Sequence, residues 1–271
     1  FEELLSTADL PEFDYIGLHG IWSWVSDKNR EVITEIIRQK LKVGGVVYVS
    51  YNTMPGWAGF APMRHLMTQH ANVLGSSGEG IINRIDDAFA FADELFALKP
   101  AYINANPQSL DRLEKIKKQN RHYLAHEFFN KDWHPMHFSQ VTELLSSAKM
   151  EFAASASLLD HVDTLQLNPA QQEFLNAIPD TTLRETVRDF VLNQQFRKDY
   201  WVKGPVPISV NDQMARVRAL RVLLTVPESK ISMKIKAGIG DALLNESVYR
   251  PIISAIAEKN IITIGEIETV L

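Results

Sequence analysis

The chain has 271 residues, of which 45% are hydrophobic and 23% charged, and its formal net charge is -5. This length and composition predict a globular protein of two or three compact units with a substantial core. The negative charge argues against broad binding to nucleic acids or anionic membranes, and the absence of cysteine excludes disulfides, thiolate metal sites and a cysteine nucleophile. No apolar run is long enough to cross a bilayer, and the first residues lack the pattern of a secretory signal. We therefore expect a cytoplasmic protein with no membrane partner.

The beginning of the chain shows the pattern of two parallel strands joined by a helix. Residues 13–18 form a short apolar run that suits a buried strand. Apolar residues then recur at helical spacing between residues 32 and 41, and residues 46–51 form a second apolar run. This order predicts a strand, a crossover helix and a second strand.

Polar and glycine residues mark the two ends of the predicted helix. Ser26 or Asp27 can cap its N-terminus. Gly44 and Gly45 follow its last apolar residue and predict a left-handed stop.

Two parallel strands with one crossover cannot stand alone as a sheet, because their edges and both faces need cover. The chain also starts at Phe1 rather than at a methionine. Both observations predict an N-terminus that is truncated or processed.

The two strands of such a unit end at the same edge, because the crossover is right-handed and the strands are parallel. Open α/β sheets bind ligands at this edge. The loops that leave it, residues 19–24 and 51–57, combine aromatic rings with polar groups. A ring face attracts ammonium and sulfonium groups, so these loops suit an apolar ligand or a cation. The alternative is that the tryptophans only close the end of the sheet or pack beneath helices.

Helical patterns follow from Ala61 onward. Residues 81–98 form one amphipathic helix, ended by Pro100, and residues 109–129 predict another. The glycine- and serine-rich segment 75–80 predicts a flexible break between helices. It follows a helix rather than a strand, which argues against a phosphate-binding loop.

Histidines at 122, 126, 134 and 137 resemble a metal site. Histidines four residues apart share a helix face, and imidazole is a good zinc ligand. However, Asn130 stands four residues after His126, so the zinc-protease pattern fails, and no cysteine or well-placed carboxylate completes a ligand set. We therefore predict no metal and expect these histidines to pack and hydrogen-bond near a helix end.

The last two segments are amphipathic helices, at residues 140–201, and a small α+β module, winged-helix-like, at residues 206–271. We expect protein contacts in the second segment rather than DNA recognition. Within the first segment, five residues suggest either a surface for an anionic partner or a solvated helix face: Arg184, Arg188, Arg197, Lys198 and Trp201.

Several motifs together resemble a known family. Residues 12–25, which contain HGIWSWV, and residues 45–57, which contain GVVYVSYNTMPGW, look like the second half of a bacterial class I S-adenosylmethionine-dependent methyltransferase. Further motifs resemble the methyltransferase regulatory domain that accompanies such enzymes, including bacterial protein-lysine methyltransferases; they lie at residues 121–127, 133–135, 138, 158–160, 184–190 and 197–204.

This resemblance implies a mixed α/β and α fold. A partial Rossmann-like methyltransferase sheet is expected first, then a mainly helical regulatory domain, and then the small C-terminal α+β module. The implied segments are 1–60 for the methyltransferase half, 61–120 for a helical connector, 121–205 for the regulatory domain and 206–271 for the C-terminal module.

The resemblance also implies the positions of the functional residues. In such enzymes a glycine-rich loop holds the cofactor and an acidic residue holds its ribose, and both belong upstream of the strands seen here, which resemble the fourth and fifth of the sheet. By position, His19 and Gly20 are implied to bind S-adenosylmethionine, and His19 and Tyr51 are the candidate catalytic bases. The implied substrate-binding residues are Trp22, Trp24, Asn52 and Trp57.

Three hypotheses follow for the function. The first is that the parent protein is an S-adenosylmethionine-dependent methyltransferase acting on a protein, with lysine as one acceptor, or on a small molecule, whereas this chain alone is inactive. The second is a non-catalytic regulatory or protein-interaction fragment. The third is a DNA-associated helical regulator. The sequence predicts no particular oligomeric state.

Overall fold

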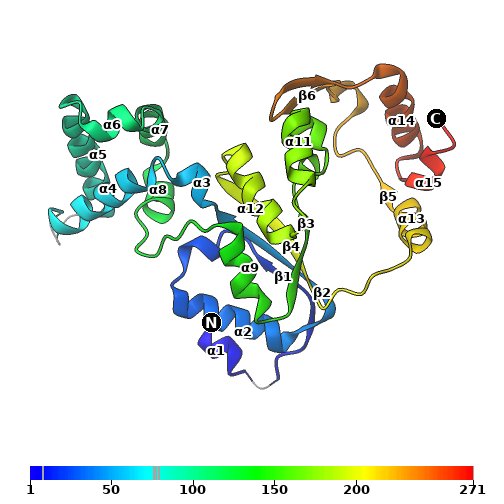
Figure 1. The fold of residues 1–271 in the computed structure, drawn as a ribbon, viewed down its shortest axis with the longest axis horizontal. Coiled ribbons are helices and arrows are strands. Elements are labelled where there is room, and N and C mark those ends of the chain that lie inside the picture. Colours follow the sequence, from blue (N-terminus) through cyan, green and yellow to red (C-terminus); the bar gives the residue numbers. More distant parts are fainter. Residues whose placement is uncertain (8, 76–77, 79, 271) are drawn as a thin grey trace. The chain divides into compact units, whose positions relative to one another are not determined.

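The computed structural model describes residues 1–7, 9–75, 78 and 80–270 (Figure 1). Contacts divide the chain into two compact units. The first comprises Phe1–Ala156 and Phe174–Gly204, and the second comprises Ser157–Glu173 and Pro205–Leu271. These two units are defined by contacts in space, whereas the four segments 1–60, 61–120, 121–205 and 206–271 were inferred from sequence motifs. The boundaries of the four segments therefore stay a prediction.

The first unit is organised around a four-stranded mixed sheet with the strand order β1-β2-β4-β3. Strand β1 (Phe13–Leu18) runs parallel to β2 (Leu41–Asn52), which confirms the predicted pair. Strand β4 (Phe196–Lys203) lies antiparallel between β2 and β3 (Met150–Ser155). Strands from both ends of the unit therefore form one sheet.

Strands β3 and β4 replace part of what the sequence suggested to be helical. Arg197 and Trp201 are buried on β4 and Lys198 is exposed, so the predicted helix face that joined them to Arg184 and Arg188 of α12 (Thr181–Leu192) does not exist. The alternation along β4 has the period of a strand. The sequence does not show the alternating apolar pattern of a strand here, because the charged Arg197 and Asp199 occupy buried positions of β4.

Helix α2 (Asp27–Lys40) connects the parallel strands. The Ser26 side chain accepts a hydrogen bond from the Asn29 N–H at 3.3 Å, which confirms one of the two predicted caps. The predicted glycine stop is wrong, because the helix ends at Lys40 and both glycines lie inside β2. Gly44 adopts a φ of 79°, in the segment where the pairing with β1 shifts register. The glycines therefore form an irregularity of the strand, of the kind that a β-bulge produces.

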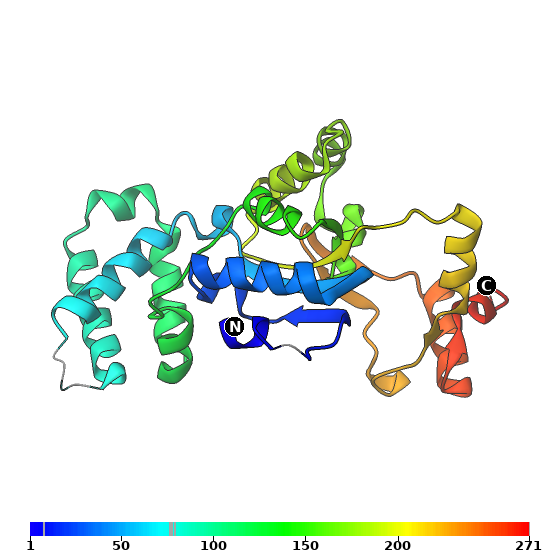
Figure 2. The ribbon, with the colours of Figure 1, turned by 90° about the horizontal axis from the view of Figure 1, so that it is seen from below.

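One face of the sheet is covered by α2 and by α9 (Phe138–Ser146), and Figures 1 and 2 show α2 running alongside the strands. Apolar residues of both helices and of the strands make a common core; they include Ile33, Ile37, Val47, Val49, Val141, Leu145 and Trp201. The opposite face carries aromatic rings near solvent. Tyr15 is 53% exposed, and the rings of Tyr48 and Tyr200 lie 5.8 Å apart.

A second core belongs to the helices between β2 and α9. These are α3 (Met54–Trp57), α4 (Ala61–Val73), α5 (Ile81–Ala97), α6 (Ala101–Ala105), α7 (Gln108–Lys117) and α8 (Arg121–Glu127). The predicted single helix over 109–129 is thus two helices. The Asn120 side chain caps α8 by accepting hydrogen bonds from the N–H groups of His122 and Tyr123. The predicted break at 75–80 lies partly outside the described residues, at 76, 77 and 79.

The second unit contains short helices and two small antiparallel sheets, β5-β8 and β6-β7. Its mixed α and β composition after residue 205 agrees with the sequence, and the winged-helix arrangement stays a prediction. Its elements are η2 (Leu158–His161), α10 (Asp163–Gln166), the start of α11 (Pro169–Asn176), α13 (Val210–Ala219), β5 (Arg221–Val222), η3 (Glu228–Lys230), β6 (Lys234–Ala237), β7 (Gly240–Leu243), α14 (Glu246–Lys259), β8 (Ile262–Thr263) and α15 (Ile264–Ile267). Across the described part of the chain, no helix is both long and apolar enough to span a membrane.

A buried ion-pair network joins α12 to the sheet. Arg197 is 6% exposed and donates to Glu185, Asp189 and Asp199 over 2.7–3.0 Å. The hydroxyl of Tyr51 on β2 donates to the same Asp199 carboxylate at 2.8 Å. Burial raises the pKa of Asp189 to about 6 and also raises the pKa of Asp199, in spite of the guanidinium beside them.

Replacing the arginine should strongly destabilise the first unit. Arg197→Met would leave three carboxylates without their counter-ion in the interior, so we expect a loss of about 3–5 kcal/mol in the free energy of unfolding. Urea unfolding at pH 7 measures this loss. The matched control is Arg38→Met, which breaks an exposed pair with Glu35 and should cost less than about 1 kcal/mol. Equal, small losses in both variants would contradict the structural role of the network.

The same network predicts a pH dependence of stability. The raised pKa of Asp189 means that the folded state binds more protons than the unfolded state between about pH 4 and pH 6. The free energy of unfolding should therefore fall as the pH rises through this window, by up to about 3 kcal/mol. Asp189→Asn removes this titration, so its stability should change less with pH than that of the unmodified protein. Parallel curves in urea unfolding at pH 4, 5, 6 and 7 would refute this assignment.

Candidate functional site

The carboxyl ends of β1 and β2 lie at one edge of the sheet, because Leu18 pairs with Val49 in the parallel register. The side chains that the sequence placed together at this edge nevertheless point to opposite faces. His19 is exposed and lies with Tyr48, its Nδ1 3.3 Å from the tyrosine hydroxyl oxygen. Tyr51 lies in the core on the other face. The two predicted bases therefore do not frame a common cleft.

The turn after β1 is open to an approaching group. Gly20 has a φ of 65°, and its N–H donates to the Ser50 hydroxyl at 2.8 Å. Apart from Gly20 itself and its two chain neighbours, no residue has a heavy atom within 4 Å of the position that a Cβ of Gly20 would take. This backbone conformation and the free space fit the close approach of a ligand such as the expected cofactor, which supports His19 and Gly20 as candidates for its site.

Tyr51 is fully buried and belongs to the ion-pair network. Burial raises the pKa of its hydroxyl well above the ordinary value, and the neighbouring Asp199 carboxylate adds to this shift. The hydroxyl donates its proton to that carboxylate. A phenol in this environment keeps its proton, so the geometry does not suit the predicted role of a base.

The predicted substrate-binding residues lie in the interior. Trp22 packs in the sheet core, and the Nε1 of Trp24 donates to the Glu127 carbonyl at 3.4 Å. Trp57 donates to the Asn52 side-chain oxygen at 3.2 Å, with the Arg112 guanidinium 3.7 Å from its ring centre. These contacts match the alternative stated above, that the rings pack beneath the helices.

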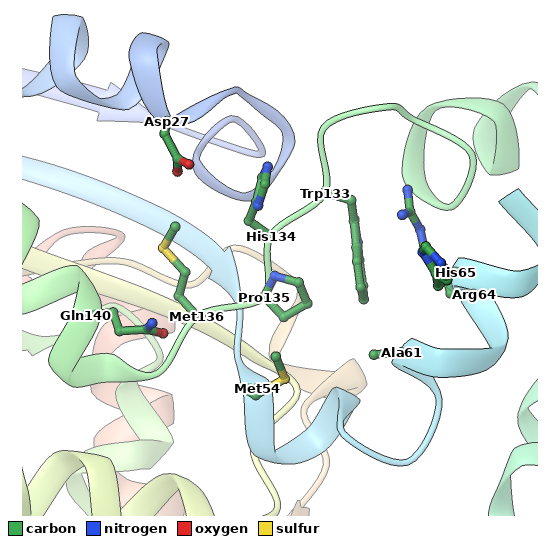
Figure 3. A pocket seen from close by; sticks show the side chains of 10 residues that line it. All are labelled: Asp27, Met54, Ala61, Arg64, His65, Trp133, His134, Pro135, Met136 and Gln140. Carbon is green, nitrogen blue, oxygen red and sulfur yellow. The ribbon is translucent and has the colours of Figure 1, made fainter. Parts of the chain in front are cut away.

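A cavity of about 420 Å³ lies just beyond the end of β2 (Figure 3). It is bounded by the start of α2, the turn after β2, helix α4, the segment before α9 and α9 itself. The lining residues are Asp27, Met54, Ala61, Arg64, His65, Trp133, His134, Pro135, Met136 and Gln140. We call this cavity the rim pocket.

Backbone hydrogen bonds fix one wall of the rim pocket to the loop after β1 and to the end of β2. The N–H of His134 donates to the Ser23 carbonyl at 2.8 Å, and the N–H of Met136 donates to the Asn52 carbonyl at 2.9 Å. The N–H of Met54 donates back to the Met136 carbonyl at 3.1 Å. Residues 133–136 therefore form a part of the sheet edge where α/β proteins place ligands.

The charged groups around the rim pocket include two arginines. Arg30 is buried and pairs with Asp27, and the guanidinium of Arg64 lies 4.6 Å from the ring centre of Trp133. Burial lowers the pKa of Arg64 to about 10. In Figure 3, Trp133 stands between His134 and the neighbouring Arg64 and His65.

The four histidines that suggested a metal site, at positions 122, 126, 134 and 137, do not lie together in the structure. Over the described ranges, no three side chains of His, Asp or Glu lie close enough together to hold a metal ion. His126 lies 3.4 Å from Glu127, and His137 stacks on Phe190 with ring centres 5.8 Å apart. Only His134 of the four lines the rim pocket.

Sequence reasoning did not identify the rim pocket. In the sequence Asp27 is a candidate helix cap, and the residues of α4 belong to a predicted helical stretch. The motif Trp133-His134-Pro135 was noticed as part of the resemblance, and it is the signal that could have pointed to this wall.

Comparisons with known proteins agree with the resemblance. A family model described as a predicted methyltransferase regulatory domain matches residues 120–203. Protein sll1526 from Synechocystis sp. is 44% identical over 268 residues, which are 99% of this chain and 52% of that protein. Protein RP789 from Rickettsia prowazekii is 26% identical over 226 residues, which are 81% of this chain and 39% of that protein. The chain thus spans about half or less of the length of these relatives.

A solved structure shares the fold. The structure of PKMT2 from Rickettsia typhi has a TM-score of 0.66 and 21% sequence identity, over 98% of this chain and 53% of that protein. PKMT2 has also been solved in complex with AdoHcy, with the same TM-score and identity. Residues 120–203 therefore match the methyltransferase regulatory domain, and the chain shares its fold with PKMT2.

Proposed function

We propose that the full-length protein containing this chain is an S-adenosylmethionine-dependent methyltransferase, and that this chain supplies the acceptor side of its active site. The observation that carries the proposal is the rim pocket, which lies beyond β2 beside a parallel strand pair with an open turn. The regulatory-domain match and the AdoHcy complex of PKMT2 support it. AdoHcy is what remains of S-adenosylmethionine after its methyl group has left.

The cofactor would supply an activated methyl group on a sulfonium sulfur. In our proposal His19 and Gly20 lie beside it, because His19 is exposed and the space that a Cβ of Gly20 would take is open. The remaining cofactor contacts would come from the part of the longer protein that this chain does not span. The exposed ring of Tyr15 and the outer edge of β1 suit cover by that part.

The acceptor in this proposal is an amine that enters the rim pocket. A volume of about 420 Å³ is in the usual range for small ligands and side chains. The Trp133 ring and the thioethers of Met54 and Met136 provide apolar walls for an alkyl chain. We propose a protein lysine as the first candidate acceptor and a small-molecule amine as the second.

The regulatory domain has a direct role in this arrangement. Five of the pocket residues fall inside the matched range 120–203: Trp133, His134, Pro135, Met136 and Gln140. The remaining wall comes from α2, the turn after β2 and α4. A movement of the regulatory segment would therefore change the shape of the acceptor site, and we propose that the domain controls access in this way.

Cofactor binding tests the proposal. Isothermal titration of S-adenosylmethionine and AdoHcy should show binding to the full-length protein and weak or no binding to this chain alone.

A substitution at Gly20 tests the position of the cofactor. Gly20→Ala in the full-length protein should raise the dissociation constant of the cofactor about tenfold, since a Cβ would enter the open turn and strain the left-handed backbone. Gly44→Ala is the matched control, because Gly44 has a similar φ and equally free space but lies away from the edge. A full-length protein that binds neither compound would favour the non-catalytic regulatory alternative.

Filling the rim pocket tests the acceptor site. Ala61→Trp should leave the affinity for the cofactor unchanged and lower kcat/KM for an amine acceptor such as poly-L-lysine by more than about tenfold, because a large ring would occupy the space of the acceptor. Ala58→Trp, at an exposed alanine one turn earlier, is the control and should behave like the unmodified protein. Equal activity of both variants would show that the acceptor binds elsewhere.

A further inference from the structure

Main-chain hydrogen bonds hold His134 at the rim pocket, and its side chain remains accessible to a ligand in the pocket. Its N–H is bonded to the Ser23 carbonyl, and the following Pro135 restricts the chain before Met136 bonds to Asn52. The imidazole is 40% exposed and lines the cavity. A group in the pocket can therefore meet a histidine whose segment is bonded through its main chain to the loop after β1 and to the end of β2.

The charged groups that face His134 come from three elements. Asp27 and Arg30 belong to α2, Arg64 belongs to α4, and Asp132 is on its own segment with a carboxylate oxygen 3.9 Å from the His134 Nε2. Burial lowers the pKa of His134, and the two guanidiniums lower it further, against the opposite effect of the two carboxylates. The imidazole is consequently neutral near pH 7 and has a lone pair that can accept a proton.

An amine acceptor needs such a group. A lysine or alkylamine reaches the protein as an ammonium ion, which has no lone pair for attack on a methyl group. The guanidiniums of Arg30 and Arg64 disfavour a further positive charge near the pocket, so the proton tends to leave. The neutral imidazole of His134 in the pocket wall can accept this proton.

We propose that His134 is the catalytic base of the rim pocket and takes the proton that an amine acceptor loses before methyl transfer; this inference rests on the proposed function. The N–H bond of the ammonium breaks, its electron pair stays on the amine nitrogen, and the proton joins the free nitrogen of the imidazole. Asp132 and Asp27 stabilise the resulting imidazolium, which passes the proton to solvent through its exposed edge.

His134 suits this role better than the two residues that the sequence suggested. Tyr51 is buried and donates to Asp199. His19 contacts Tyr48 on the opposite sheet face and does not line the rim pocket. Of the other groups in the pocket, Asp27 is engaged by Arg30, and His65 lies beyond Trp133 from His134 in the view of Figure 3.

The test compares His134→Gln with His122→Gln in the full-length protein. His122 is exposed on α8 and does not line the pocket, so it is the matched control. Methylation of poly-L-lysine is followed from pH 5 to pH 9, with the dissociation constant of AdoHcy as a check on the fold. We expect His134→Gln to lower kcat about 100-fold and to remove the acid limb of the pH profile, with unchanged AdoHcy affinity. His122→Gln should match the unmodified protein.

A second measurement does not depend on turnover. The pKa of His134, followed by NMR of the imidazole carbons and assigned with the glutamine variant, should lie below the ordinary histidine value of about 6.5 and should shift when n-butylamine is added. A pKa of His134 above 7, or a His134→Gln variant that keeps the normal rate and pH profile, would overturn the inference. Failure of the unmodified protein to bind AdoHcy would refute the proposed function itself. Binding of AdoHcy without methylation of any amine would refute the amine acceptor and leave the methyltransferase proposal standing.

Discussion

One buried guanidinium, that of Arg197, ties helix α12 to the two central strands of the sheet. It neutralises carboxylates on α12 and on its own strand, and through Asp199 it also holds the Tyr51 hydroxyl of β2. An isolated charge at this depth would be very costly, so the network forms only when all of its elements are in place. The end of β2, and with it the edge where the rim pocket lies, depends on this assembly.

The regulatory domain is consequently not a separate appendage. Its matched range contributes β3 and β4 to the sheet, and the segment Trp133–Met136 bonds to the loop after β1 and to the end of β2. Both connections consist of main-chain hydrogen bonds between distant parts of the sequence. A change in this domain can therefore reach the rim pocket through the backbone, without a change in any pocket side chain.

The balance of charges gives the rim pocket its chemical character. Arg30 and Arg64 face Asp27 and Asp132, so the surroundings are close to neutral overall while burial disfavours new charge. Such an environment lowers the pKa of His134, and in our proposal it also favours loss of a proton from an amine that enters. Methyl transfer to nitrogen requires the uncharged amine, which links the proposed function to the residues that the structure brings together.

The sequence by itself determined β1, α2 and β2, because apolar periodicity, a serine cap and the handedness of crossovers are local or general properties. It also indicated the edge where the two strands end. Only the tertiary structure decided which side chains lie together at that edge of the sheet. Tyr48 and Tyr51 are three residues apart on β2, so strand alternation places them on opposite faces, and the charged Arg197 and Asp199 at buried positions conceal the strand pattern of β4. The segment with His134 lies some eighty residues after β2 and is placed by hydrogen bonds to Ser23 and Asn52, a long-range contact that no local pattern encodes.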